Sequence, residues 1–124
     1  MERRTMNRIL IADDEEALQR LYKEEFEEDG YEVLLAGNGK EVLALLEDPA
    51  HLPDVIVMDI RMPELDGIAT LRAIKEKYPP LPVILCSAYS EFKQDFSTWA
   101  SDDYVVKSSD LTELKEAVKR LTKK

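Results

Sequence analysis

Cysteine and long apolar stretches are scarce in this chain, and each scarcity excludes a class of structure. Cys86 is the single cysteine, so no internal disulfide can form, which agrees with a reducing cytoplasm as the expected location. The longest apolar runs fall far short of the roughly 20 residues that a membrane-spanning helix needs. The N-terminal MERRTMNR leads into a run that is too short for a signal peptide. The sequence therefore predicts neither a disulfide framework nor a membrane segment.

Positive charge is also in short supply. The 124 residues carry 17 lysines and arginines against 26 aspartates and glutamates, which gives a net charge of −9 and a pI near 4.7. Sequence-independent binding to nucleic acid needs a basic face that displaces counterions, so this balance argues against nucleic acid and against anionic membranes as partners. A content of 44% hydrophobic and 35% charged residues is typical of a soluble globular fold, and the length predicts one domain over residues 1–124.

Short apolar runs alternate along the chain with segments of helical periodicity. The strand-like runs cover residues 9–12, 31–36, 55–58, 83–85 and 104–106, and helical spacing marks residues 18–26, 42–46, 68–78, 90–99 (weakly) and 111–121. Strict alternation predicts parallel strands joined by right-handed crossovers, with helices on both faces of the sheet. Strands covered on both faces must be apolar throughout, as four of the five runs are. We therefore predict a three-layer α/β fold.

Polar side chains follow four of the predicted strands. They are Asp13 and Asp14 after the first strand, Asp59 after the third, Ser87 after the fourth and Lys107 after the fifth. Ligands of open α/β sheets bind beyond the carboxyl ends of the strands. If the strand order is 2-1-3-4-5, these groups converge on one rim, with Asp59 as the floor of a pocket and residues 61–67 as the loop around it.

Carboxylates gathered at such a rim predict a metal site. Three of them within a few ångströms repel one another by roughly 4 kcal/mol per pair at an effective dielectric near 20. Mg²⁺ relieves this repulsion, prefers oxygen ligands and is usually held by one or two carboxylates plus a phosphate; Mn²⁺ is the alternative ion. The ionised Asp59 can then attack phosphorus to form an aspartyl phosphate without a general base. Lys107 and Ser87 would contact the phosphoryl oxygens.

The complete pattern resembles the receiver domain of two-component response regulators. The matching segments are Asp13-Asp14, DIRMPELDG at 59–67, CSAY at 86–89 and DDYVVK at 102–107, and the likeness runs from residue 9 to residue 121. It implies a flavodoxin-like (βα)5 fold with the strand order 2-1-3-4-5. It also implies a signalling switch in which Asp59 accepts a phosphoryl group from the phosphohistidine of a sensor histidine kinase or of a phosphotransfer protein.

The resemblance further assigns the metal ligands and the phosphoryl contacts. Asp13, Asp14 and Asp59 would hold the metal together with the backbone carbonyl of Arg61. Lys107 would pair with the phosphoryl group. The domain would act as a phosphoacceptor that assists its own phosphorylation and slow dephosphorylation, and not as a classical enzyme.

The resemblance also implies how the signal leaves the site. Ser87 would move toward the phosphoryl group, and Tyr104 would turn inward behind it. This would change the surface of the fourth helix, the fifth strand and the fifth helix, within residues 91–99 and 104–121. That surface would bind a downstream protein target, an output domain or a second copy of the chain.

Two departures from the family pattern carry predictions. The family usually has a proline after the lysine, in a cis peptide, whereas Ser108 follows Lys107 here. A non-proline cis bond costs about 3 kcal/mol, so we predict a trans peptide. Arg61 and Tyr89 stand two residues after Asp59 and Ser87, at positions that tune phosphoaspartate hydrolysis in the family. Both are bulky, so we predict hindered access of water and a long-lived phosphorylated state.

Each matched residue also has a purely structural interpretation. Asp13 and Asp14 can cap a helix and favour its dipole. Asp59 and Ser87 can be turn residues at strand ends, and Lys107 can be a solubilising charge. These interpretations are reasonable for single residues, but they do not explain why acids and a lysine fall on the same predicted rim.

Other functions fit the residues less well. A receiver-like interaction module that works without phosphate would usually have lost Asp59, Lys107 or an acid of the pair, and all are present. A haloacid-dehalogenase-like phosphohydrolase needs a second acid two residues after its nucleophile, where this chain has Arg61. A flavodoxin needs a Ser/Thr/Gly-rich phosphate loop after the first strand, where the run of acids at residues 13–16 would repel phosphate.

Overall fold

Five parallel strands and the helices that cover them form three layers. The computed structural model describes residues 6–88 and 101–122. The strands are β1 (Arg8–Ala12), β2 (Glu32–Ala36), β3 (Val55–Met58), β4 (Val83–Ser87) and β5 (Asp103–Val106), in the order β2-β1-β3-β4-β5. The helices are α1 (Glu16–Glu28), α2 (Gly39–Leu46), α3 (Gly67–Lys77) and α4 (Thr112–Thr122), with a short 3-10 helix at Pro49–His51.

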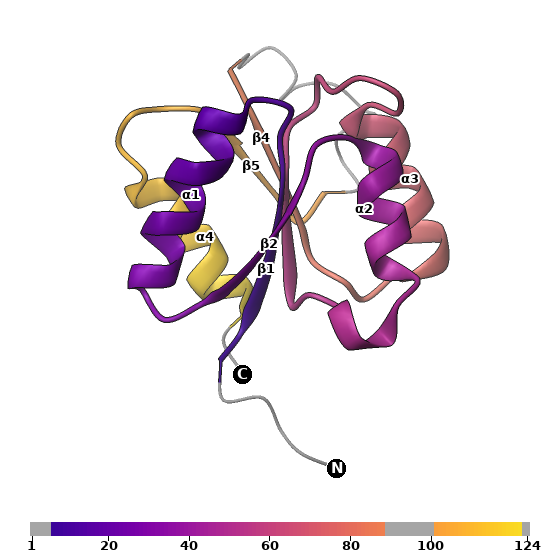
Figure 1. The fold of residues 1–124 in the computed structure, drawn as a ribbon, viewed down its shortest axis with the longest axis horizontal. Helices are drawn as coiled ribbons and strands as arrows, with labels where there is room; N and C mark the ends of the chain where they lie inside the picture. The colour runs from indigo at the N-terminus through magenta and orange to yellow at the C-terminus, as the bar shows by residue number, and fades with distance from the viewer. Residues whose placement is uncertain (1–5, 89–100, 123–124) are drawn as a thin grey trace.

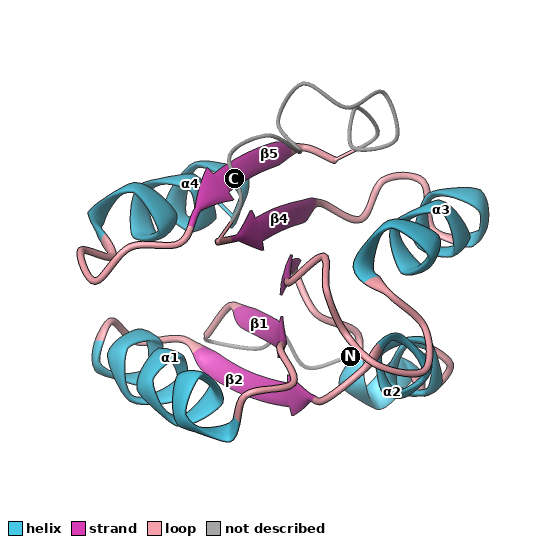
Figure 2. Ribbon diagram, turned by 90° about the horizontal axis from the view of Figure 1, so that it is seen from above, coloured by secondary structure: helices cyan, strands magenta, loops and turns pink. Residues whose placement is uncertain are grey.

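The α-helices of the described residues cover both faces of the sheet. In Figures 1 and 2, α1 and α4 lie on one face, and α2 and α3 lie on the other. The predicted fold class and strand order are therefore confirmed. The helix that we expected over residues 90–99 lies outside the described residues, so α4 corresponds to the fifth predicted helix.

The central strands are apolar because both of their faces are covered. Every residue of β1, β3 and β4 is buried. Successive side chains point to opposite faces, so Leu10 and Met58 join the core under α2 and α3, while Ile9 and Val57 join the core under α1 and α4. The edge strand β2 is only partly buried, as its alternating sequence predicted.

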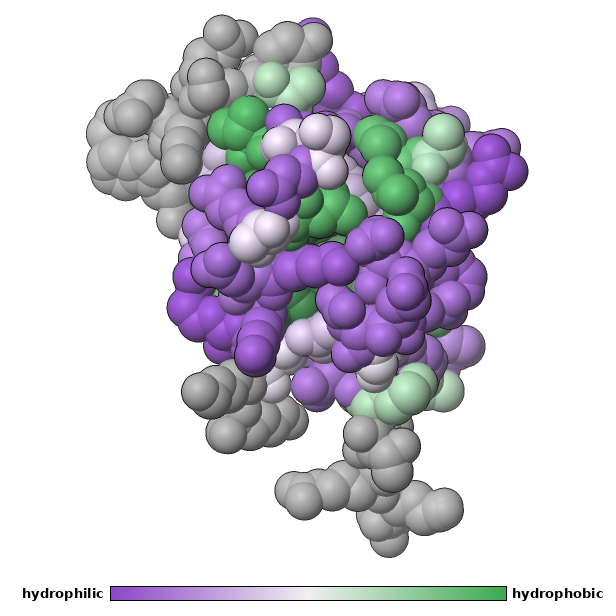
Figure 3. Space-filling view, turned by 90° about the vertical axis from the view of Figure 1, so that its left-hand side faces the viewer, coloured by the Kyte–Doolittle hydropathy of each residue, from purple (hydrophilic) through white to green (hydrophobic). Residues whose placement is uncertain are grey.

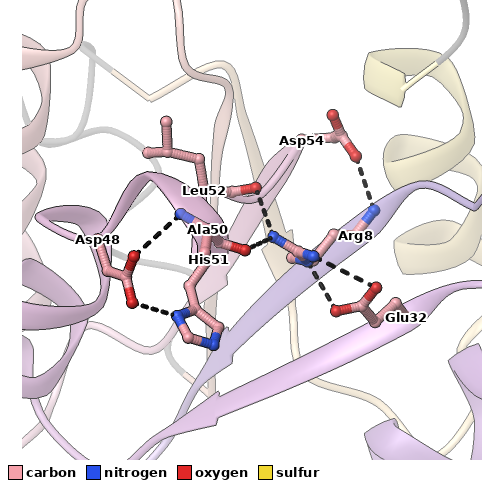
Figure 4. A network of polar contacts seen from close by, with 7 residues as sticks. All are labelled: Arg8, Glu32, Asp48, Ala50, His51, Leu52 and Asp54. Atoms are coloured by element: carbon pink, nitrogen blue, oxygen red, sulfur yellow. Dashed lines mark hydrogen bonds and ion pairs between the residues drawn. The ribbon is translucent and has the colours of Figure 1, made fainter. Parts of the chain in front are cut away.

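A buried arginine ties together the end of the sheet where β1, β2 and β3 begin (Figure 4). The guanidinium of Arg8 donates to the Glu32 carboxylate, with 2.8 Å between Nε and Oε2, and to the carbonyl oxygens of Ala50 at 2.7 Å and Leu52 at 3.3 Å. The backbone N–H of Arg8 donates to the Asp54 carboxylate at 2.7 Å. A charge can be buried when it is paired and hydrogen-bonded in this way. The network lies at the end of the sheet opposite the polar strand ends described below.

No helix among residues 6–88 and 101–122 has the length and apolar character needed to cross a membrane.

Candidate functional site

The backbone of the sheet positions the residues that follow the strands. Sheet-like hydrogen bonds continue one residue past the strand ends: Asp13 N–H donates to the Ala36 carbonyl at 3.0 Å, and Asp59 N–H donates to the Ala12 carbonyl at 2.9 Å. At the other side, Lys107 N–H donates to the Ser87 carbonyl at 2.7 Å. These bonds fix the backbone of the three residues relative to the sheet, although the residues stand in loops.

Three carboxylates meet at this rim, as predicted. One oxygen each from Asp13, Asp14 and Asp59 lies within 4.8 Å of the others. Asp13 is 2% exposed and Asp59 is 8% exposed, whereas Asp14 faces solvent. The cluster thus has a buried base and one open side, through which a ligand can enter.

Lys107 bridges the two buried acids. Its Nζ donates to Asp13 Oδ2 at 2.8 Å and to Asp59 Oδ2 at 3.0 Å. The remaining oxygens accept backbone N–H groups: Asp13 Oδ1 from Glu15 at 2.9 Å, and Asp59 Oδ1 from Arg61 at 3.4 Å. Charge pairing of this kind offsets the cost of burying ionised groups.

Burial and pairing act in opposite directions on these groups. Burial is the main cause that raises the pKa of Asp59 above its usual value, while the ammonium of Lys107 opposes that rise and the charge of Asp13 adds to it. For Lys107, burial lowers the pKa, but hydrogen bonds to Asp13 and Asp59 outweigh it and raise the pKa above its usual value. Burial thus disfavours the ionised form of Asp59, and a bound cation would offset that cost.

The turn-rich segment after β3 folds tightly against Asp59. Gly67 begins α3, and its N–H donates to the Ile60 carbonyl at 2.8 Å. A Cβ at position 67 would overlap the Asp59 carbonyl oxygen and would stand 2.8 Å from Ile60 Cα. Asp66 caps the helix by accepting from the Ala69 N–H at 2.9 Å. Only glycine fits where the start of α3 meets the strand end.

Ser87 and Tyr104 are both buried near the rim. Ser87 ends β4 and is fully buried, and Tyr104 in β5 is 7% exposed and packs in the core under α2 and α3. The peptide bonds of the described residues are all trans, which confirms our prediction for Lys107–Ser108. Arg61 is exposed beside Asp59. Tyr89, the other residue expected to tune hydrolysis, lies outside the described residues.

One contact at the site was not predicted. The side-chain amide of Gln19, in α1, donates to the backbone carbonyl of Asp13 at 2.5 Å. The sequence offered only a weak signal for it, a polar residue six positions after Asp13 on a helix that begins at the rim.

The donor set fits a hard divalent cation. Three clustered carboxylates supply only oxygen ligands, and the open side at Asp14 leaves room for water and for a phosphate oxygen. The absence of histidine and cysteine among these clustered ligands disfavours zinc or copper and favours Mg²⁺. The carbonyl of Arg61 stays a predicted fourth ligand.

The family model and the related proteins that we compared all point to response regulators. The model of the response regulator receiver domain family matches residues 9–119. The regulatory protein AtoC of Escherichia coli is 43% identical over 117 residues, which cover 93% of this chain and 25% of AtoC. The transcriptional regulator NtrC of Salmonella typhimurium is 34% identical, over 90% of this chain and 24% of NtrC. The chain thus spans about a quarter of the length of these two relatives.

Solved structures of response regulators match this chain in fold and over nearly its whole length. The response regulator TrrA of Thermotoga maritima, crystallised with Mg²⁺ and BeF, has a TM-score of 0.89 and 43% identity, over 94% of this chain and 99% of TrrA. TrrA in complex with the histidine kinase ThkA gives a TM-score of 0.85 over 94% of this chain and 98% of TrrA.

Proposed function

The chain belongs to the response regulator receiver domain family, and from this premise we propose that it is a phosphorylation-activated switch whose acceptor is Asp59. The observation that carries the proposal is the cluster of three carboxylates, of which Asp13 and Asp59 accept hydrogen bonds from Lys107. The relative TrrA forms complexes with a histidine kinase and with Mg²⁺ and BeF, which supports a phosphohistidine as donor and Mg²⁺ as metal.

The proposed transfer needs little from the protein beyond position and charge. An oxygen of the Asp59 carboxylate attacks phosphorus in line, and the bond from phosphorus to the donor nitrogen breaks, with its electron pair staying on that nitrogen. Lys107 is already placed beside Asp59 and can contact a phosphoryl oxygen while it keeps its bond to Asp13. Bound Mg²⁺ would supply positive charge that offsets repulsion between the carboxylates and the incoming phosphoryl group.

Phosphorylation is tested directly with a small donor. The protein is incubated with acetyl phosphate and Mg²⁺, and its intact mass is measured. We expect one phosphoryl adduct on the parent chain and none on Asp59→Asn. No adduct at saturating donor would favour the alternative, a receiver-like interaction module that works without phosphate.

The output surface is the second part of the proposal. We propose that the surface of β5 and α4 changes when Ser87 and Tyr104 respond to the phosphoryl group. The rest of the predicted readout surface, residues 91–99, lies outside the described residues. The longer relatives are regulators, which supports a downstream protein or an attached output domain as the partner; a homodimer through the same surface is the further alternative. Comparing amide hydrogen exchange of β5 and α4 with and without phosphorylation tests this.

The entry surface for the donor is proposed on the face that carries α1 and α4. Leu21 of α1 is 40% exposed and lines a cavity of about 310 Å³ with Leu111 and the start of α4. Figure 3 shows this face as largely hydrophilic, with apolar side chains gathered toward its upper part, the end where α1 begins. A groove that combines two leucines with charged and polar side chains suits an amphipathic helix of a protein donor.

The lifetime of the phosphorylated state completes the proposal. Arg61 is exposed next to Asp59, and its bulk and that of Tyr89 would hinder attack by water, so we propose slow autodephosphorylation. Replacing both residues with small ones should speed the loss of the mass adduct. A rapid loss that the double replacement leaves unchanged would contradict this. A cytoplasmic location stays a prediction that cell fractionation would test.

A further inference from the structure

The peptide that joins the first two acids of the site is held by a side chain from α1. Asp13 and Asp14 are consecutive, so the carbonyl of Asp13 belongs to the planar peptide unit between them. Gln19 Nε2 donates to that carbonyl at 2.5 Å. The same nitrogen lies 3.5 Å from the Ala36 carbonyl at the end of β2, which also accepts the Asp13 N–H at 3.0 Å. One amide group therefore joins the ends of β1 and β2 to α1.

The orientation of this peptide sets the direction of the Asp14 side chain relative to the Asp13 carboxylate. The buried Asp13 carboxylate is already fixed by Lys107 and by the Glu15 N–H. Asp14 is exposed, so its direction depends mainly on the peptide plane from which its Cα departs. If the Asp13 carbonyl loses its donor, the plane can rotate while the sheet bond of the Asp13 N–H persists. The spacing between the carboxylates of Asp14 and Asp59 would then vary.

We propose that Gln19 is a positioning residue of the metal site, which sets the relative placement of the Asp13 and Asp14 carboxylates through the backbone between them. The proposal rests on the function proposed above for this site. The amide of Gln19 contacts backbone carbonyls at the strand ends, so it acts on the carboxylates only through the peptide that it holds. Residues that orient metal ligands in this indirect way typically affect metal affinity by about 10- to 100-fold.

The decisive variant is Gln19→Met, which keeps the length and volume of the side chain but removes its N–H donors. A second variant, Gln19→Asn, keeps the amide but is one methylene too short to reach. The matched control is Arg20→Met, at the next position of α1, where the side chain is exposed. Binding of Mg²⁺ alone is measured by titration calorimetry, and the free energy of unfolding is measured by urea denaturation in EDTA.

We expect Gln19→Met and Gln19→Asn to bind Mg²⁺ about tenfold more weakly than the parent, in line with other indirect contacts to metal ligands. Unfolding in EDTA should stay close to that of Arg20→Met, because the lost bond acts on a loop peptide. Rates of phosphorylation by acetyl phosphate should recover at saturating Mg²⁺. A purely structural glutamine would lower stability and leave the Mg²⁺ affinity of the folded protein unchanged.

Two results would overturn the proposal: parent-like Mg²⁺ affinity in Gln19→Met, or an equal loss in Arg20→Met. If Gln19→Met does not fold, the calorimetric result for Gln19→Asn decides. Failure of the proposed function would look different, because the parent chain itself would then take up no Mg²⁺ or no phosphoryl group.

Discussion

At the scale of single residues, the site pairs Asp59, whose ionised form is disfavoured by burial, with Lys107, whose positive charge partly offsets that cost. Burial raises the pKa of Asp59, so the folded state holds a proton on this group more tightly than the unfolded state does. The contribution of Asp59 to stability is therefore fully present below the usual carboxylate range and is lost as pH rises through the raised pKa. At neutral pH, the ionised Asp59 is a cost to the metal-free fold.

This cost predicts that Asp59→Asn stabilises the protein when Mg²⁺ is absent. Asparagine removes the buried charge and can still accept from Lys107, so we expect a gain of about 1 kcal/mol at pH 7.5, an ordinary size for a point mutation. The gain should shrink at acid pH, as the pH falls through the raised pKa of Asp59 and the carboxylate takes up its proton. Urea denaturation in EDTA at pH 7.5 and at acid pH measures it, with Glu47→Gln on the exposed end of α2 as control. Equal stability of parent and variant at both pH values would contradict the account.

Cys86 allows an independent test of burial behind the site. Burial raises the pKa of its thiol to about 11, although the charge of Lys107 opposes the rise, and the side chain is 3% exposed. Since the thiolate is the reactive form, iodoacetamide should modify the folded protein at pH 8 at least roughly 100-fold more slowly than the urea-unfolded chain. Mass spectrometry follows the reaction. Comparable rates in the two states would mean that the fold does not protect this position.

The residues that carry chemistry were predictable from sequence because each follows an apolar run that can only be a buried strand. Asp13, Asp14, Asp59 and Lys107 meet once the strand order is known. The contact of Gln19 was not predictable, because it depends on how α1 approaches the strand ends, and helical periodicity does not specify that approach.

At the scale of elements, the strands were easier to predict than the boundaries between them and the helices. Apolar runs covered on both faces mark β1, β3 and β4 clearly. The start of α4 was less clear: the predicted helical spacing began at residue 111, and the structure begins the helix at Thr112, whose N–H donates to Asp110 at 2.9 Å. The need for glycine at position 67 also followed only from the structure, since it arises from the packing of α3 against the end of β3.

Gly67→Ala should disturb the acceptor as well as the fold. The new Cβ would collide with backbone atoms of Asp59 and Ile60, and backbone cannot move as cheaply as a flexible side chain. We expect a loss of about 1–3 kcal/mol in the free energy of unfolding, typical of overpacking, and weaker Mg²⁺ binding in the protein that remains folded. Ala69→Gly is not a suitable control because it alters helix propensity. Gly30→Ala is better, since no atom lies within 4 Å of its added Cβ and its φ of 93° confines the effect to local backbone strain.

The groove beside α1 predicts a separation between protein donors and small donors. Leu21→Glu places a charge in the lining of this groove, which includes Leu111 but none of the clustered acids and not Lys107. Phosphotransfer from the histidine kinase that reacts fastest in a panel should fall at least tenfold, while phosphorylation by acetyl phosphate stays unchanged. Glu24→Gln, on the exposed side of the same helix, serves as control. Parallel losses with both donors would indicate damage to the site itself.

At the scale of the whole molecule, the two ends of the sheet differ in how their charged groups are paired. The end with the Arg8 network is fully paired and fixes the N-terminal ends of the strands. The opposite end gathers acids beside Lys107, and a cation bound among them would stabilise the domain. A ligand that binds only the folded state stabilises the entire domain by mass action, so occupancy of this site is coupled to global unfolding.

This coupling predicts a magnesium-dependent melting temperature. At a Mg²⁺ concentration 100 times the dissociation constant, the parent should gain about 2.7 kcal/mol, which corresponds to roughly 10 °C in Tm for a domain of this size. EDTA should reverse the gain, and Asp59→Asn should gain much less because it lacks one of the three carboxylates proposed to hold the metal. Scanning calorimetry measures the melting temperature of the parent with Mg²⁺, of the parent with EDTA and of Asp59→Asn. We expect Asp59→Asn to melt at a higher temperature than the parent without metal, because the substitution should stabilise the metal-free fold. As Mg²⁺ is added, the parent should become the protein with the higher melting temperature. If the variant keeps the higher melting temperature across the titration, Asp59 is not part of the metal site.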